Sequence, residues 1–198
     1  MNHPAAPARR APGRAAPDPR RVRGFTLIEL AIVVAIVGTM VSMAAPSLTR
    51  LADSVRLTGA SNSLLSSLRL ARSEARKRGD RVLMCKSADG LVCTTAGGWE
   101  QGWILFQDRN ASGGFDEGDT VIQVQQALPG RLSITGNRPV ASAIAYSPIG
   151  VSRGVSGAML SGTITLCRRS LEPVAARQIV ISSGGRPRVK QLEVDHCG

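Results

Sequence analysis

The feature that most constrains this chain is an apolar stretch near its N-terminus, from Gly24 to Pro46, with the sequence GFTLIELAIVVAIVGTMVSMAAP. No charged residue occurs from Leu30 to Thr49. A helix of about 20 apolar residues, at about 1.5 Å rise per residue, spans roughly 30 Å, which is the thickness of a bilayer core. The stretch therefore predicts a helix that crosses a membrane.

A basic segment precedes this stretch and predicts its orientation. The segment contains one acid, Asp18, and six arginines: Arg9, Arg10, Arg14, Arg20, Arg21 and Arg23. Positive charge stays on the cytoplasmic side, so we expect a cytoplasmic N-terminus and an exported remainder. A cleaved secretory signal fits less well, because its apolar region is about 7–15 residues long and residues 44–46 form a poor cleavage site.

One acid, Glu29, interrupts the apolar stretch near its start. A plain membrane anchor explains the length of the stretch but not this residue, because an acid in the apolar part of a membrane helix is costly. A buried charge is tolerated when an opposite charge neutralises it. We therefore expect Glu29 to have a partner or a task.

Residues 24–29, with the sequence GFTLIE, resemble the processing site of type IV pilins and pseudopilins. The resemblance implies cleavage after Gly24 by a prepilin peptidase on the cytoplasmic side, followed by N-methylation of Phe25. It also implies that Glu29, at mature position five, pairs with the N-terminal amine of a neighbouring subunit. Such a subunit crosses the bacterial inner membrane once, with a periplasmic head, and is then assembled with other pilins into a pilus or pseudopilus.

These observations divide the chain into four segments. We expect a cleaved leader over 1–24, a transmembrane and assembly helix over 25–46, an amphipathic second half of the helix over 47–79, and a β-rich head over 80–198. Gly38 and Pro46 interrupt the helical pattern, and the proline predicts a kink. Gly79-Asp80 predicts the end of the helix.

The second half of the helix has an apolar stripe and a basic face. The stripe recurs at spacings of three and four, apart from a gap around Gly59, and comprises Leu48, Leu51, Val55, Leu64, Leu65, Leu68, Ala71 and Ala75. This pattern predicts a helix that packs on a sheet. The opposite face carries Arg69, Arg72, Arg76, Lys77 and Arg78, which we interpret as a solvated basic face favoured by the helix dipole.

Short β-like runs separated by turn residues follow the helix. They cover residues 81–86, 99–107, 120–125, 131–135, 143–146, 162–166, 178–182 and 189–194. Strands at this spacing predict an antiparallel sheet or sandwich. The expected fold class is therefore α+β, with a long kinked N-terminal helix packed on an antiparallel β head. Three of the six aromatic residues, Trp99, Trp103 and Phe106, are expected in the core rather than in a base-stacking platform.

The four cysteines predict two disulfides. Cys85, Cys93, Cys167 and Cys197 all lie in the part of the chain expected to be exported, where disulfides form. Of the three possible connectivities, we favour Cys85–Cys93, which closes a short loop, and Cys167–Cys197, which ties down the C-terminus. A zinc site is not expected, since no CxxC is present and His196 is the only histidine after the leader.

A calcium-binding loop is an alternative interpretation of residues 108–119, which have the sequence DRNASGGFDEGD. Five residues fall at positions 1, 3, 5, 6 and 12 of a calcium-loop spacing: Asp108, Asn110, Ser112, Gly113 and Asp119. However, a strand rather than a helix precedes the loop, and position 12 is Asp rather than the longer Glu. A polar turn between strands explains the same composition, so we expect no metal and no cofactor.

Charge favours a polyanionic partner without identifying it. The chain has a formal net charge of +11, and residues 25–198 alone carry 19 basic and 13 acidic residues. The segment 182–190, SSGGRPRVK, places Arg186, Arg188 and Lys190 at alternate positions, so that in an extended backbone they project to one side. Three such cations match the spacing of a phosphate backbone. A solvent-exposed hairpin whose arginines only increase solubility explains the same pattern equally well.

Five segments of the head carry a second resemblance: VLMC, then C…WEQGWILFQDRN, YSPIG, ITLC and IVISSGGRPR. In these segments the chain resembles the GspH/FimT group of minor pilins and pseudopilins. In FimT-like members a Gly-Arg-x-Arg motif is associated with binding of DNA during natural transformation, and the resemblance places this motif at Gly185, Arg186 and Arg188. It therefore implies a DNA partner, expected to be double-stranded.

Two other functions remain open. GspH-like members belong to the pseudopilus tip of type II secretion, and a third possibility is a minor pilin that primes assembly and binds no ligand. No enzyme is expected, because no catalytic constellation with a suitable histidine and no P-loop or dinucleotide fingerprint is present.

Overall fold

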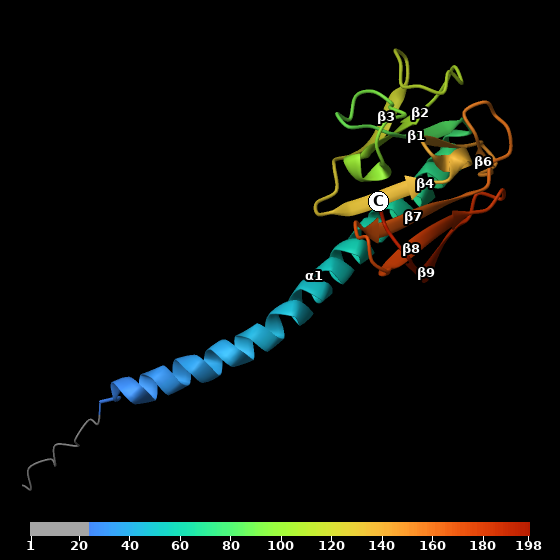
Figure 1. The fold of residues 1–198 in the computed structure, drawn as a ribbon. Helices are drawn as coiled ribbons and strands as arrows, with labels where there is room; N and C mark the ends of the chain where they lie inside the picture. Colours follow the sequence, from blue (N-terminus) through green and yellow to red (C-terminus); the bar gives the residue numbers. More distant parts are fainter. Residues whose placement is uncertain (1–23) are drawn as a thin grey trace, which may run out of the picture. The chain divides into compact units, whose positions relative to one another are not determined.

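The computed structural model describes the backbone of residues 24–198, and the side chains of these residues other than 43–47 and 50 (Figure 1). The expected leader, apart from Gly24, lies outside the described residues. The chain divides into two units, Met1–Ala45 and Pro46–Gly198.

Helix α1 runs from Leu27 to Arg78 and is assigned as one uninterrupted element of 52 residues. It therefore starts two residues later than the sequence predicted. The helix assignment continues through Gly38 and Pro46, and the kink expected at Pro46 stays a prediction. The helix ends where predicted, because Gly79 adopts a φ of +65° that favours glycine. The next amide, of Asp80, donates to the carbonyl of Ala75 at 3.2 Å, a bond typical of a helix C-terminus.

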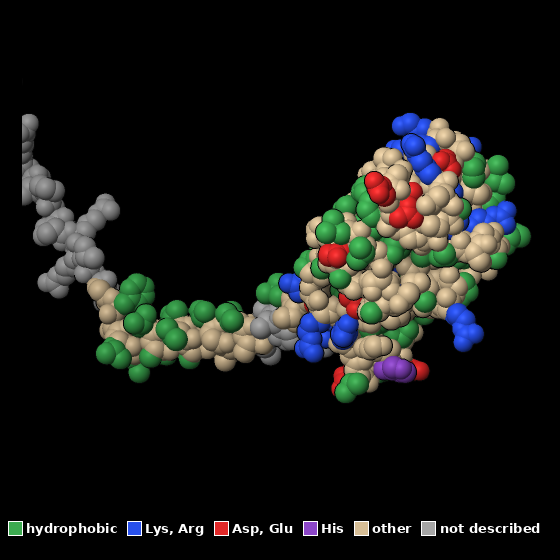
Figure 2. Space-filling model, turned by 90° about the horizontal axis from the view of Figure 1, so that it is seen from above, with side chains coloured by type: hydrophobic (Ala, Val, Ile, Leu, Met, Phe, Trp, Pro, Cys, Tyr) green, Lys and Arg blue, Asp and Glu red, His purple; other side chains and the backbone are tan. Residues whose placement is uncertain are grey.

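The first part of α1 exposes its apolar side chains. Hydrophobic side chains project along this segment (Figure 2), and Phe25 and Leu27 are 82% and 86% exposed. Among the residues that the structure describes, no helical stretch is both long and apolar enough to cross a bilayer. The transmembrane assignment of residues 25–46 stays a prediction.

The later part of α1 buries one stripe in the head. The buried residues recur at spacings of three and four and are Leu57, Ala60, Leu64, Leu68, Ala71 and Ala75. Full burial of one leucine side chain contributes about 1.5–3 kcal/mol. The stripe is shorter than the sequence predicted, since Leu48, Leu51 and Val55 are each more than 60% exposed. Periodicity identified an apolar face, but only tertiary packing determines where that face is covered.

Two antiparallel sheets complete the head (Figure 1). The first has the order β3-β2-β1-β5-β6 and consists of β1 (Val82–Lys86), β2 (Trp103–Gln107), β3 (Thr120–Gln125), β5 (Ala143–Tyr146) and β6 (Ser152–Arg153). The second has the order β4-β7-β8-β9 and consists of β4 (Leu132–Gly136), β7 (Gly162–Arg168), β8 (Val174–Ile181) and β9 (Pro187–Val194). A helix packed on antiparallel sheets confirms the predicted α+β class.

The main core lies where the helix stripe meets both sheets. Leu64 and Leu68 from the helix join Met84 of the first sheet and Ile164 and Ile179 of the second in one buried cluster. Strand β1 is central, because it pairs with β2 on one side and β5 on the other. All five of its side chains are buried, which hides the alternation expected of a half-exposed strand.

Three sequence-based assignments in the head need correction. Strand β8 begins at Val174, four residues before the predicted run 178–182, and ends at Ile181. Residues 99–107 were expected to form one strand, but Trp99–Gln101 forms a 3₁₀ helix and β2 begins only at Trp103. Gly102 separates the two with a φ of +110°, a conformation that interrupts a strand and favours glycine. The two-residue strand β6 was missed, because so short a run carries no periodic signal.

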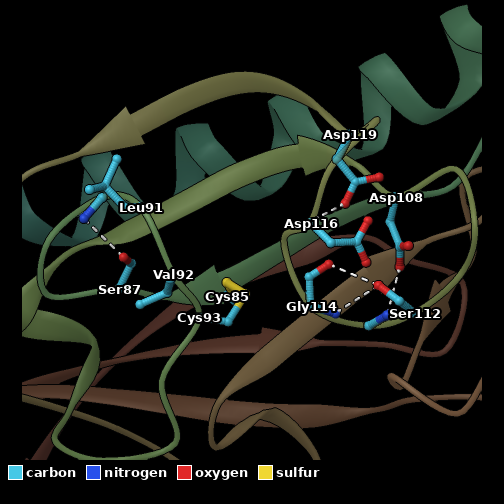
Figure 3. Close-up of a disulfide and its surroundings, with 12 residues drawn as sticks. Cys85, Ser87, Leu91, Val92, Cys93, Asp108, Ser112, Gly114, Asp116 and Asp119 are labelled. Carbon is cyan, nitrogen blue, oxygen red and sulfur yellow. Dashed lines mark hydrogen bonds between the residues drawn. A yellow bond between two sulfur atoms is a disulfide. The ribbon is translucent and has the colours of Figure 1, made fainter.

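The structure contains both disulfides that the sequence favoured, Cys85–Cys93 and Cys167–Cys197. The first closes the loop after β1 (Figure 3). The same loop is held by Lys86, whose buried Nζ donates to the carbonyls of Thr95 at 2.9 Å and Gly97 at 2.7 Å. Burial lowers the pKa of this lysine.

The 108–119 loop is stabilised by its own polar groups (Figure 3). Asp108 accepts a hydrogen bond from Gly113 N–H at 3.2 Å and pairs with Arg81 at 3.3 Å. Burial raises the pKa of Asp108, and Arg81 opposes this shift. Asp119 accepts backbone bonds from Arg109 and Asp116. Among the described residues, no three His, Cys, Asp or Glu side chains are grouped to hold a metal ion.

We predict that the two disulfides differ in their contribution to stability. They span sequence separations of 30 and 8 residues, so the chain-entropy relation gives about 3.6 kcal/mol for Cys167–Cys197 and about 2.5 kcal/mol for Cys85–Cys93. Urea unfolding of the two Cys→Ser double variants measures this difference in the free energy of unfolding. A larger loss for the Cys85–Cys93 pair would contradict the prediction.

Candidate functional site

The turn between β8 and β9 carries the two arginines of the Gly-Arg-x-Arg motif, Arg186 and Arg188. The turn is closed by Gly185 N–H, which donates to the carbonyl of Ser182 at 2.8 Å. Gly185 is buried and has a φ of +75°, so a residue with a side chain would be strained there. The glycine thus sets the point at which the chain enters β9.

This turn packs directly on a second turn, residues 147–150. A Cβ atom placed on Gly185 would overlap the carbonyl oxygen of Gly150 and lie 3.2 Å from the amide nitrogen of Ser152. The hydroxyl of Ser152 is buried and lies 2.9 Å from the carbonyl oxygen of Ser182. The backbone of one turn therefore rests against the backbone of the other with no room for a methyl group.

Arg72 of α1 fastens both turns to the helix. Its Nε donates to the carbonyl of Gly150 at 2.8 Å, and its Nη2 donates to the carbonyl of Gly184 at 3.3 Å. Its side chain is half-buried. Charge-assisted hydrogen bonds of this kind are among the stronger polar contacts in proteins, so Arg72 positions the turn that carries Arg186 and Arg188.

A groove of about 400 Å³ opens between α1 and this turn. We call it the arginine groove, and its lining residues are Arg69, Arg72, Ser73, Arg76, Arg186, Pro187 and Arg188. Five of the seven residues are arginines, and they come from two elements that are distant in sequence. The structure therefore joins the C-terminal motif to three arginines of the helix.

No carboxylate in the described part of the chain neutralises this groove. Its lining residues include no Asp or Glu, and none of its five arginines forms an ion pair with another described residue. Like charges gathered in one place repel each other, and an anion bound between them relieves that repulsion. The arrangement is suited to binding a polyanion through its charged oxygens.

Lys190 lies apart from the groove. In β9 it pairs with Gln178, and Arg188 pairs with Val180, so both side chains project from the face of β9 opposite to that of Pro187. The alignment predicted for three cations is present for Arg188 and Lys190, whereas Arg186 precedes β9 and lies in the turn. Lys190, however, is not among the groove's lining residues.

The interpretation of the helix arginines as a solvated face holds for Arg69 and Arg76, which are exposed. It is wrong for Arg72, which is half-buried and hydrogen-bonded to two turns. All three arginines line the groove. Their spacing of three and four residues did show that they share one helix face. What the sequence did not reveal is that the turn after β8 lies against that face.

The predicted processing residues lie at the start of α1. Gly24 and Phe25 are exposed and precede the helix. Glu29 forms reciprocal contacts with Thr26: its amide donates to the Thr26 hydroxyl at 3.3 Å, and its carboxylate accepts from the Thr26 amide at 3.5 Å. This is a capping box, which stabilises a helix N-terminus. The proposed pairing of Glu29 with a neighbouring subunit's amine stays a prediction.

A head of two antiparallel sheets on a long N-terminal helix, with a processing motif before that helix, defines a type IV pilin-like protein. The family described as Type II transport protein GspH matches residues 60–185, and the prokaryotic N-terminal methylation motif matches residues 19–45. The chain belongs to the GspH family of type IV pilins and pseudopilins. The family match ends at Gly185, directly before Arg186.

One similar sequence and one similar crystal structure are consistent with this family membership. The chain is 30% identical over 176 residues to the pilin-like protein PilA1 of Thermus thermophilus, covering 85% of this chain and 98% of that protein. Its fold is similar to the crystal structure of the type IV minor pilin FimU of Pseudomonas aeruginosa, with a TM-score of 0.55 and 16% identity over 75% of this chain and 99% of the FimU chain. Families of this kind are structural rather than enzymatic, and membership implies processing by a prepilin peptidase, membrane anchoring and assembly with other pilins in a fibre.

We predict that Gly185→Ala destabilises the head, because the new methyl group meets the Gly150 carbonyl and the positive φ is strained. The expected loss is about 1–3 kcal/mol of unfolding free energy, measured by urea denaturation. Gly184→Ala is the matched control, since its Cβ would meet only the Ser182 hydroxyl, at 4.0 Å. Equal stability of the two variants would contradict the packing of the turns described above.

Proposed function

We propose that this minor pilin binds extracellular double-stranded DNA through the arginine groove, for uptake in natural transformation. The observation that carries the proposal is the convergence of five arginines on one groove without a carboxylate among its lining residues. The resemblance of Gly185-Arg186-Pro187-Arg188 to the motif of DNA-binding FimT-like pilins supports it. Lys190 adds a cation beside Arg188 on the same face of β9.

The composition of the groove favours contacts with phosphates over contacts with bases. No aromatic residue lines it, so it offers no platform on which unpaired bases could stack. Arginine binds phosphate oxygens through its planar array of donors, and such contacts carry no sequence information. Duplex DNA presents one charge per about 1.7 Å of helix axis, which makes it a dense source of phosphates. We therefore expect sequence-independent binding of duplex DNA.

The affinity of one subunit is expected to be modest. Non-specific DNA binding at physiological salt has a Kd of about 10⁻⁴ to 10⁻⁶ M. Several copies on one fibre would strengthen capture, because each further contact becomes intramolecular once the first is made.

We predict that Arg186→Gln with Arg188→Gln weakens DNA binding by about 10- to 100-fold, because two charge-assisted contacts are lost. Fluorescence anisotropy with a labelled 20-base-pair duplex, using the full chain in detergent, measures the change. The charge-matched control is Arg109→Gln with Arg131→Gln, since both arginines are exposed and lie outside the groove. Equal weakening by both double variants would show that only net charge matters and would contradict the assignment of the site.

A second candidate is a pseudopilin of type II secretion, which the match to the GspH family supports. In that role the partners are proteins, and the groove has no DNA ligand. Deletion of the gene separates the two functions: loss of DNA uptake with normal secretion supports the first, and loss of secretion with normal DNA uptake supports the second.

A further inference from the structure

We propose that Arg69 and Arg76 of α1 bind phosphates directly and form a second side of the DNA site, opposite Arg186 and Arg188. This inference rests on the proposed function and extends it. The motif in the β8–β9 turn would then be half of a composite site. One strand of the DNA backbone would lie in the arginine groove, between the helix and the turn.

The two helix arginines lie in the groove, and their guanidinium groups are available to bind an anion. Both are exposed, both line the groove, and the seven-residue separation puts them about 10.5 Å apart along the helix axis. Arg72 lies between them and is already engaged by the Gly150 and Gly184 carbonyls. Among the described residues, Arg69 and Arg76 form no ion pair and no side-chain hydrogen bond.

The neighbouring basic residues of α1 differ in just this respect. Lys77 and Arg78 both pair with Glu74, at 3.8 Å and 2.7 Å, and Arg78 also donates to Gln107 at 3.2 Å. The pKa of Glu74 is lowered, first by its hydrogen bond from Arg78. If the basic face served only solubility, there would be no reason for two of its cations to be paired with a carboxylate and two others to be unpaired. Lys77 and Arg78, which lie outside the groove, are paired with Glu74, whereas Arg69 and Arg76, which line it, have no carboxylate partner among the described residues.

The composite site changes the number of phosphates that the protein neutralises. Arg186, Arg188 and Lys190 alone would give a slope of log affinity against log salt of about −2.7, which is about a 40-fold loss of affinity between 50 and 200 mM salt. Addition of Arg69 and Arg76 brings the slope to about −4.5, which is about a 500-fold loss. The salt dependence therefore distinguishes a one-sided site from a composite one.

The test compares the wild-type chain without residues 1–24, in detergent, with Arg69→Gln plus Arg76→Gln in the same chain. Anisotropy with a labelled 20-base-pair duplex between 50 and 200 mM salt measures binding, and removal of the leader excludes its six arginines from the slope. We expect the slope to fall from about −4.5 to about −2.7. Arg69→Lys plus Arg76→Lys should keep the wild-type slope, because it keeps both charges. Lys77→Gln plus Arg109→Gln removes the same charge outside the groove and should also keep it. Thermal unfolding of each variant verifies that the head remains folded.

The outcomes separate this inference from the proposed function. If Arg69→Gln plus Arg76→Gln keeps the wild-type slope while Arg186→Gln plus Arg188→Gln loses binding, the inference is wrong and the proposed function stands. If the lysine variant loses slope as the glutamine variant does, the inference is also wrong, since charge is then not what the two residues supply. If the wild type does not bind the duplex even at 50 mM salt, the proposed function fails and this inference with it.

Discussion

Burial of one stripe of α1 against both sheets is the interaction on which the head depends. Leu64 and Leu68 are fully buried and belong to the same cluster as residues from β1, β7 and β8. Neither sheet has another helix of comparable length to cover it among the described residues. The stripe also fixes the rotation of the helix about its own axis. Arg69, Arg72 and Arg76 face the β8–β9 turn only because residues interleaved with them, Ala71 and Ala75, are held in the core.

Local chemistry accounts for what could be predicted from the sequence. The helix end at Gly79, the bounds of β3 and β5, and the two disulfide pairs follow from signals carried within a few residues or from loop length. The missed features depend on tertiary contacts. Leu48, Leu51 and Val55 continue the helical period, yet nothing in the period shows that the head covers the helix only from Leu57. Likewise, the motif around Arg186 indicated half of the candidate site, but the helix half becomes apparent only when the chain is folded.

The scaffold around the arginine groove holds like charges together by backbone contacts. Arg72 donates to two carbonyls, and Gly185 lets one turn rest on the other without an intervening side chain. The partners in these contacts are neutral backbone groups rather than carboxylates. They therefore position the guanidinium groups without neutralising the positive charge of the groove. The site is thus preorganised, and little side-chain or loop ordering is left to oppose binding of an anion.

The disulfide between Cys167 and Cys197 has a mechanical consequence. Strand β9 begins beside the groove, is aligned with β8 over eight residue pairs, and ends next to a cysteine that is covalently joined to β7. A force applied at Arg188 along the direction of β9 would load these hydrogen bonds together in shear, and the tension would then reach a covalent bond rather than a free chain end. A pull on the helix arginines would pass directly into α1. Both sides of the groove therefore transmit force to parts of the subunit that do not readily peel away.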